Sequence, residues 1–128
     1  MTVVDASVVV QAASDVGTAG HLARSLVAAG SAPDVVFVES YSALRRRHLR
    51  GELSEEAFWF GLRFLDAVPL RIRDSRGLLP RMAELVPSVS AFDAAYVALA
   101  EVLDVPLVTT DARLARAHGL RCEVRLLT

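Results

Sequence analysis

The sequence predicts an α/β fold, a three-layer α/β/α domain with a central, mostly parallel sheet. Short β-branched segments, such as residues 105–109, alternate along the chain with longer segments whose apolar residues recur at helical spacing. Strands separated by helices form parallel sheets that are covered on both faces. The 128 residues suit one domain, 1–128, and no linker or change of composition divides them.

The first part of the chain predicts one strand and two helices. Residues 2–5 begin with a β-branched strand, and residues 7–13 can continue as a helix. A second helix is expected over residues 20–29, with Gly30 as its stop.

Segment 35–50 is ambiguous between strand and helix. Its beginning, residues 35–38, is β-branched or aromatic and favours a strand. The later apolar residues Leu44 and Leu49 suit a helix, and Asp34 is a candidate cap. Helix is the preferred interpretation.

The rest of the chain has clearer signals. Ser54 is a cap residue followed by two acids and then apolar residues at helical spacing, so a helix is expected to begin there and end before Pro69. We then expect a strand over 69–73, a helix to about residue 86, a helix over 90–103, a strand over 105–109, a short helix over 112–118 stopped by Gly119, and a strand over 123–127.

Composition excludes several classes of protein. Hydrophobic residues make up 53% and charged residues 23%, which excludes a disordered chain. The net charge of −1, from 14 basic and 15 acidic residues, provides no global field for recruiting nucleic acid. Every basic residue is arginine, so no lysine is present to bind phosphate in a P-loop.

Neither a membrane span nor a signal peptide is expected. The longest stretches without a charge, 6–14 and 25–33, have nine residues, whereas a span needs about 18. The N-terminal residues 1–5 have no basic region and include an acid. Cys122 is the only cysteine, so it forms no internal disulfide. We therefore expect a cytoplasmic protein with no membrane partner.

Four acids stand at the ends of predicted elements, where parallel sheets place their ligand sites. Asp5 ends the first strand, Asp111 follows strand 105–109, and Glu39 and Asp93 lie in the first turns of their helices. Three of these acids have structural explanations: Asp93 and Asp111 suit helix caps, and Glu39 suits a solvated helix face. Asp5 is different, because its neighbours are apolar and a lone buried carboxylate is costly.

As a set, the four acids suggest a metal site. Carboxylates about 5 Å apart would repel by about 3 kcal/mol per pair at an effective dielectric constant near 20. A hard divalent cation would relieve that repulsion, and oxygen ligands favour Mg²⁺ or Mn²⁺ over zinc. Such a site suits phosphodiester hydrolysis. Spacing along the chain leaves open whether the four converge.

Four segments in order resemble the motifs of PIN-domain proteins, specifically VapC-type toxins of type II toxin–antitoxin systems. The segments are Val3-Val-Asp5-Ala-Ser7, Pro33-Asp-Val-Val-Phe-Val-Glu39-Ser-Tyr, Ser90-Ala-Phe-Asp93-Ala-Ala-Tyr96 and Pro106-Leu-Val-Thr-Thr-Asp111-Ala-Arg. Aspartate motifs are weak individually, but all four in order are specific. The resemblance runs from residue 2 to about residue 117.

This resemblance implies a PIN-like fold and a metal-dependent endoribonuclease that cleaves RNA to leave a 5′-phosphate and a 3′-hydroxyl. The implied catalytic and metal-binding residues are Asp5, Glu39, Asp93 and Asp111, of which Asp5 and Asp93 are the best candidates for direct ligands. Ser7 and Thr110 match small hydroxyl positions that orient water or the carboxylates. The implied cofactor is Mg²⁺, for which Mn²⁺ can substitute. The implied partners are RNA, a second copy in a homodimer and a small VapB-like antitoxin.

Arginines after the second motif are candidates for holding RNA phosphate. Arg45, Arg46 and Arg50, with Arg47, concentrate positive charge in the second half of segment 35–50. The simpler explanation is a solvated face that complements the helix dipole. Three further arginines have weaker claims: Arg71, Arg73 and Arg76.

Other side chains receive structural interpretations. Aromatic residues surround one helix, which favours core packing together with a subunit or partner contact; they are Phe58, Trp59, Phe60 and Phe64. The histidines have no ligand spacing and are expected on the surface; they are His21, His48 and His118. Cys122 is expected to be a small buried hydrophobe.

Two other functions compete with the nuclease. The first is a non-catalytic PIN-like module that binds RNA or a protein partner without cutting. The second is a small-molecule phosphatase of another α/β fold, whose first strand would need Asp-x-Asp, whereas Asp5-Ala-Ser7 lacks the second acid.

Overall fold

The computed structural model describes all residues from 1 to 128 and contains one five-stranded sheet, ordered β3-β2-β1-β4-β5. The strands are β1 (Thr2–Val4), β2 (Gly30–Pro33), β3 (Arg71–Arg73), β4 (Leu107–Thr109) and β5 (Val124–Leu126). Every neighbouring pair is parallel. The predicted α/β class and parallel sheet are therefore confirmed.

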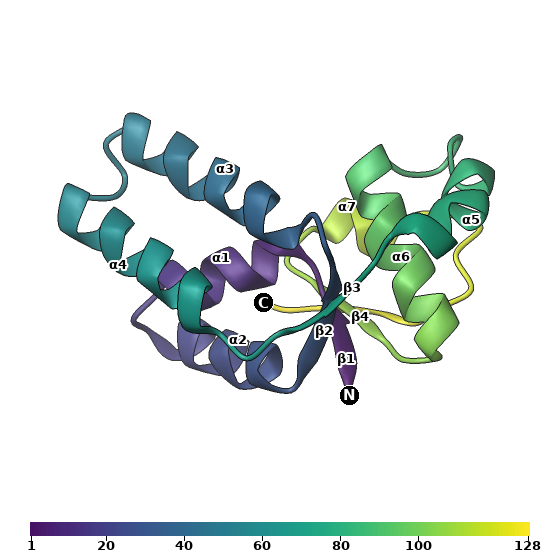
Figure 1. The fold of residues 1–128 in the computed structure, drawn as a ribbon, viewed down its shortest axis with the longest axis horizontal. Helices are drawn as coiled ribbons and strands as arrows, with labels where there is room; N and C mark the ends of the chain where they lie inside the picture. Colours follow the sequence, from purple (N-terminus) through teal and green to yellow (C-terminus); the bar gives the residue numbers. More distant parts are fainter.

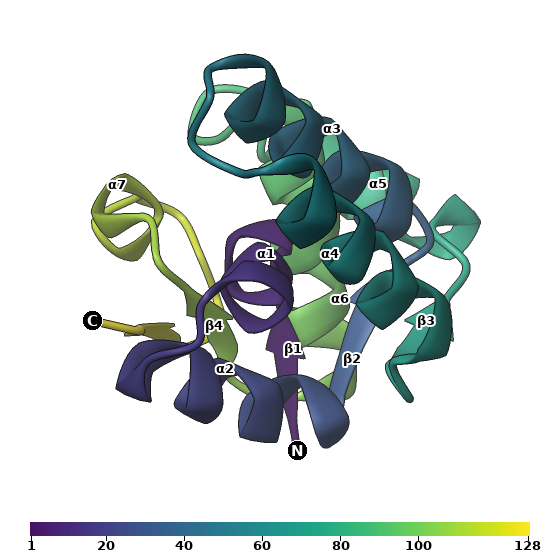
Figure 2. The same ribbon diagram turned by 90° about the vertical axis from the view of Figure 1, so that its left-hand side faces the viewer.

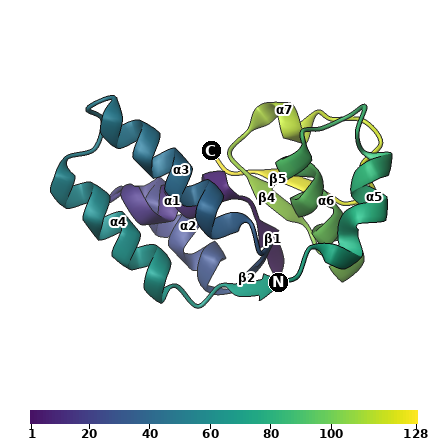
Figure 3. The same cartoon turned by 45° about the horizontal axis from the view of Figure 1, so that its top comes forward.

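Helices cover the sheet from both sides, as Figures 1 and 3 show. They are α1 (Ala6–Ser14), α2 (Thr18–Ala28), α3 (Val36–Leu49), α4 (Glu55–Ala67), α5 (Leu79–Glu84), α6 (Ala91–Leu103) and α7 (Ala112–Ala115), with a 3₁₀ turn η1 at Arg76–Leu78. Helices α1 to α4 pack together on one side, α5 and α6 lie on the other, and α7 lies beside β4 and β5. Figure 2 shows α1 and α2 in front of the sheet.

The core forms where the sheet meets α1 and α6. Val3 and Val4 of β1 and Val8 and Val9 of α1 are completely buried. The whole stretch 94–100 of α6 is buried, since this helix is apolar on every side and lies within the fold. The central strand and these two helices therefore form the buried framework from which the residues that follow them are positioned.

The direction of the sheet order changes between β1 and β4. The chain leaves β1 toward β2 and β3, and later returns to place β4 on the opposite side of β1. In open parallel sheets, the crevice beyond the strand ends at such a point is the usual ligand site. Asp5 directly follows β1, and Asp111 follows β4 by two residues, so both lie at this crevice.

Most elements occur where predicted, and segment 35–50 is a helix. Helix α2 and its C-cap Ala29 end directly before Gly30, as expected, but Gly30 also begins β2, a strand that was not predicted. Its four residues include no valine, isoleucine or aromatic side chain, and burial between β1 and β3 defines it instead.

Two predicted helix signals were wrong. Asp34 does not cap α3, because its carboxylate accepts a hydrogen bond from the Ser75 N–H at 3.2 Å. Helix α7 is shorter than expected and ends at Ala115 with Arg116 as its C-cap, so Gly119 is not its stop. Gly119 instead adopts a positive φ of 81° in the following loop.

Two of the three histidines lie on the surface, and the third is partly buried. His21 and His118 are exposed as expected. His48 is partly buried, stacks on Phe58 at 4.7 Å between ring centroids and pairs through Nδ1 with the Leu53 carbonyl at 2.9 Å. No helix combines the length and the apolar character needed to cross a bilayer.

Candidate active site

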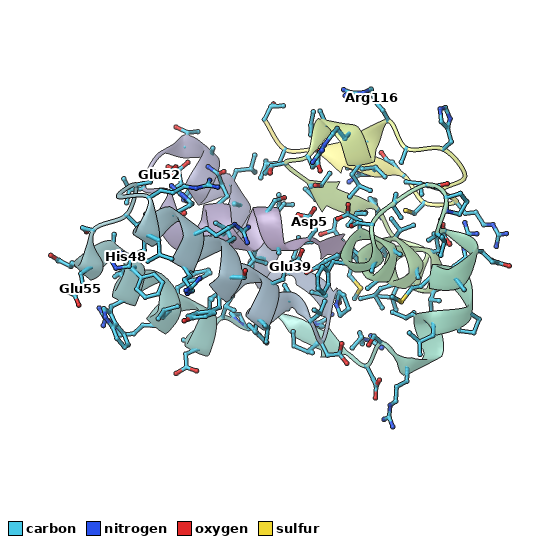
Figure 4. The ribbon with its side chains drawn as sticks, turned by 90° about the horizontal axis from the view of Figure 1, so that it is seen from above. Asp5, Glu39, His48, Glu52, Glu55 and Arg116 are labelled. Atoms are coloured by element: carbon cyan, nitrogen blue, oxygen red, sulfur yellow. The ribbon has the colours of Figure 1, made fainter.

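The four predicted acids line one cavity of about 530 Å³ at the crevice between β1 and β4. Its other lining residues are Ala6, Ser7, Val10, Gln11, Ala43, Arg46, Arg47, Tyr96, Thr110 and Arg113. Figure 4 shows Asp5 and Glu39 near the centre of the molecule, between the two groups of helices. Residues separated by more than 100 positions in the sequence therefore meet at one site.

Asp5 is held most firmly of the four. It caps α1, because its Oδ1 accepts from the Val8 N–H at 3.3 Å and also from the Ser7 hydroxyl. Its Oδ2 accepts from the Thr109 hydroxyl at 2.5 Å. Burial raises the pKa of Asp5 and the charge of Asp93 adds to this, whereas the three hydrogen bonds oppose it.

The two hydroxyls also accept hydrogen bonds from the turn after β4. The Thr110 N–H donates to Ser7 Oγ and the Asp111 N–H donates to Thr109 Oγ1, both at 3.0 Å. This network ties the end of β1 to the end of β4. Ser7 therefore lies beside Asp5 as expected, but the second hydroxyl is that of Thr109 rather than Thr110, which contributes its N–H.

Glu39 faces the same cavity from the first turn of α3. Its Oε1 accepts a hydrogen bond from the Tyr96 hydroxyl at 2.6 Å. Burial raises the pKa of Glu39, and the charges of Asp5 and Asp93 raise it further, against the Tyr96 hydrogen bond and the charge of Arg46.

Asp93 lies in the first turn of α6, where its N–H donates to the capping Ser90 hydroxyl at 3.2 Å. Burial raises the pKa of Asp93, and the charge of Asp111 adds to the effect, whereas Ser90 and Arg113 oppose it. Asp5, Glu39 and Asp93 are thus a group of carboxyls that all resist ionisation, because they share a partly desolvated space.

Asp111 behaves differently. It caps α7 by accepting from the Arg113 N–H at 2.9 Å, and the Arg113 guanidinium lies 3.4 Å from the same oxygen. Partial burial acts to raise the pKa of Asp111, but the hydrogen bonds and charge of Arg113 outweigh it and lower the pKa. This acid already has a cationic partner.

Only one of the three arginines predicted to bind RNA lines the cavity. Arg46 does so and donates to Ser42 at 3.0 Å, whereas Arg45 and Arg50 are exposed away from the cavity. Arg47 also lines it and donates to the Ser14 hydroxyl at 2.8 Å. The cavity is therefore lined by arginines as well as by acids.

Sequence reasoning missed three groups at the site: the Tyr96 hydroxyl, the Thr109 hydroxyl and the Arg113 guanidinium. Tyr96 had a usable signal, because it lies three residues after Asp93 and so one helical turn along the same face. Thr109 had no such signal, because it lies beside Asp5 only through the pairing of Val4 with Val108.

The donor set suits a hard divalent cation. All four side chains are carboxylates, and three of them have raised pKa values because of burial and mutual repulsion. In this structure, however, no group of three or more Asp, Glu, His or Cys side chains is arranged so that it could hold a metal ion. The chemistry of the four side chains therefore fits Mg²⁺ or Mn²⁺, while their arrangement in this structure is not that of a formed metal site.

The fold and the site define the class of this protein: it is an α/β domain with an acid-lined cavity at the switch point of a parallel sheet. The family model described as "PIN domain" matches residues 2–120. The chain belongs to the PIN-domain family.

Full-length relatives include ribonucleases of the VapC type. "Ribonuclease VapC1" of Mycobacterium tuberculosis is 42% identical over 98% of this chain and 96% of its own. "Ribonuclease VapC12" of the same species is 35% identical over 99% of both chains. The crystal structure of PAE2754 from Pyrobaculum aerophilum has a TM-score of 0.68 at 18% identity, covers 96% of this chain and 81% of its own, and supports the fold.

Proposed function

We propose that this protein is a Mg²⁺-dependent endoribonuclease and the toxin of a toxin–antitoxin pair. The observation that carries the proposal is the meeting of Asp5, Glu39, Asp93 and Asp111 in one cavity at the switch point of the sheet. The names of its full-length relatives support RNA as the substrate.

In this proposal the four acids hold the cation, and Asp5 and Asp93 are the best candidates for direct ligands. Bound Mg²⁺ supplies charge stabilisation at the phosphodiester and lowers the pKa of water. Ser7 and Thr109 keep Asp5 in position, because each donates a hydrogen bond to one of its oxygens. Arg46 and Arg47 provide positive charge on the cavity wall, where they can receive an RNA phosphate.

The same proposal includes protein partners and a cytoplasmic location, where the RNA is. Trp59 and Phe60 are exposed apolar side chains on α4, and Phe60 lines a second cavity of about 560 Å³ formed with α1 and α2. These side chains support the prediction that the aromatic helix contacts a partner, namely a second copy or a helical segment of a VapB-like antitoxin.

Incubation of the purified, partner-free chain with total RNA tests the activity. We expect discrete products with Mg²⁺ or Mn²⁺, none with chelator, and 5′-phosphate ends when the products are ligated to adaptors. Products that persist in chelator, or that carry 3′-phosphates, would contradict a carboxylate–metal mechanism.

The second candidate is a PIN module that binds RNA without cutting it. The observation in its favour is that the carboxylates are not already arranged to hold a metal. It predicts RNA binding that is independent of divalent ions and intact RNA in every condition above.

A further inference from the structure

Tyr96 is a completely buried side chain of α6 that reaches the acid-lined cavity. It follows Asp93 by one helical turn, so both residues present their polar ends to the same space. Its ring packs in the main core, beside the sheet. A phenylalanine would fill that volume equally well, so the packing does not explain the hydroxyl.

The hydroxyl has one role in the structure: it donates to Glu39 Oε1 at 2.6 Å. Glu39 belongs to α3, on the opposite side of the sheet from α6, so this bond crosses the crevice between the two helical layers. It is also the single hydrogen bond that the Glu39 carboxylate receives from the protein. Asp5, by contrast, receives three.

The geometry points to Tyr96 as a positioning residue that presents the Glu39 carboxylate to a divalent cation. By occupying Oε1, the hydroxyl orients the carboxylate plane and leaves Oε2 free to face the cavity. Hydrogen-bond donors of this kind orient metal ligands, and their loss typically costs about 10- to 100-fold in metal affinity. This inference rests on the proposed metal-dependent function.

Calorimetric titration with Mn²⁺, without RNA, tests the inference by a readout independent of catalysis. We expect Tyr96→Phe to weaken Mn²⁺ binding by about 10- to 100-fold. The control variant Tyr41→Phe should leave Mn²⁺ binding unchanged. Tyr41 lies two residues from Glu39 on α3 but does not line the cavity. Adding Tyr96→Phe to Glu39→Gln should cause no further loss.

The outcomes separate this inference from the proposed function. Equal Mn²⁺ affinity of Tyr96→Phe and the wild type, in a wild type that binds Mn²⁺ and cuts RNA, overturns the positioning role alone. The positioning role is also overturned if Tyr96→Phe weakens Mn²⁺ binding as much in the Glu39→Gln protein as in the wild type. Tyr96 would then act through a group other than Glu39. A wild type that neither binds Mn²⁺ nor cuts RNA overturns both.

A second measurement keeps the inference testable if Tyr96→Phe does not fold. The chain has two tyrosines, so Tyr41→Phe protein labelled with ¹³Cζ-tyrosine reports Tyr96 alone. We expect its resonance to shift saturably with Mg²⁺, because Glu39 becomes a weaker acceptor when it binds the cation, and this shift to vanish with Glu39→Gln. A resonance that does not move at saturating Mg²⁺ overturns the inference.

Discussion

Asp5 combines the deepest burial of the four acids, with 5% of its surface exposed, with hydrogen bonds to both carboxylate oxygens. Burial alone would favour the neutral carboxyl, and the donors partly restore the charged form. They also prevent the side chain from rotating. Hydrogen bonds to both oxygens therefore fix the direction of the Asp5 carboxyl, while burial keeps its pKa raised.

The hydroxyl of Thr109 is therefore expected to matter more than that of Thr110. Thr109→Val keeps the side-chain shape but removes the donor to Asp5, so we expect RNA cleavage to fall by about 10- to 100-fold. Thr110→Val is the matched control, because Thr110 contacts the network through its N–H. Equal rates for the two variants in a cleavage assay would contradict this role.

Asp93 is expected to lower the stability of the metal-free fold. Its pKa is raised above the ordinary 3.8, so between the two values the folded chain binds more protons than the unfolded chain. The free energy of unfolding therefore decreases as pH rises through that interval and stays reduced at neutral pH.

Thermal unfolding of Asp93→Asn in chelator checks this sign. We expect a higher Tm than that of the wild type at neutral pH, and a difference that disappears once the wild-type carboxyl is protonated in acid. A Tm below the wild type at neutral pH, or a difference independent of pH, would show that Asp93 does not carry this penalty.

The acids of the site and the Ser7 partner of Asp5 could be predicted from the sequence, but the Thr109 partner of Asp5 could not. Asp5 and Asp111 follow predicted strands, and parallel strands end at one edge of a sheet. The identity of the hydroxyl donor depends on the register between β1 and β4, which places Thr109 rather than Thr110 beside Asp5. Register is a tertiary property, and no local pattern of residues reports it.

At the scale of elements, α6 joins the core to the site. Its body is buried against the sheet, while its first turn carries Asp93 to the cavity. The start of this helix determines where the acid lies. Ser90 defines that start, because its hydroxyl accepts from the Asp93 N–H.

Ser90→Ala should therefore lower the free energy of unfolding by about 1 kcal/mol, the usual cost of losing a helix cap. Ser88→Ala is the matched control, since Ser88 is also exposed but caps no helix. Chemical denaturation of both variants measures the difference. A loss of equal size in both would mean that the cap contributes nothing specific.

Elements with their own local signals were predictable, and those without them were not. Helix α4 begins after the predicted cap Ser54, whose hydroxyl accepts from the Ala57 N–H at 3.1 Å. Strand β2, Gly30–Pro33, is a strand because two other strands enclose it, and its own residues are poor strand formers.

At the scale of the whole molecule, charge is organised locally rather than globally. A net charge of −1 attracts no polyanion from a distance. Arg46 and Arg47 nevertheless line the same cavity as the acids. RNA binding should therefore depend on a few arginines at the cavity.

Arg46→Ala, made in an Asp5→Asn background so that RNA stays intact, tests this arrangement. We expect weaker RNA binding and a salt dependence reduced by about 0.7 in slope, the value for one phosphate contact on a single strand. Arg45→Ala, one position away but outside the cavity, should change neither quantity. If the two variants bind alike, RNA does not approach by this wall.

The most direct test of the central claim is the rate of RNA cleavage by Asp5→Asn in saturating Mg²⁺. Asp66→Asn, an exposed acid on α4, is the matched control, and circular dichroism verifies that both variants fold. If the acid-lined cavity is the nuclease site, Asp5→Asn makes no detectable product and Asp66→Asn cuts at the wild-type rate. Wild-type cleavage by a folded Asp5→Asn variant would contradict the assignment of the cavity as the active site.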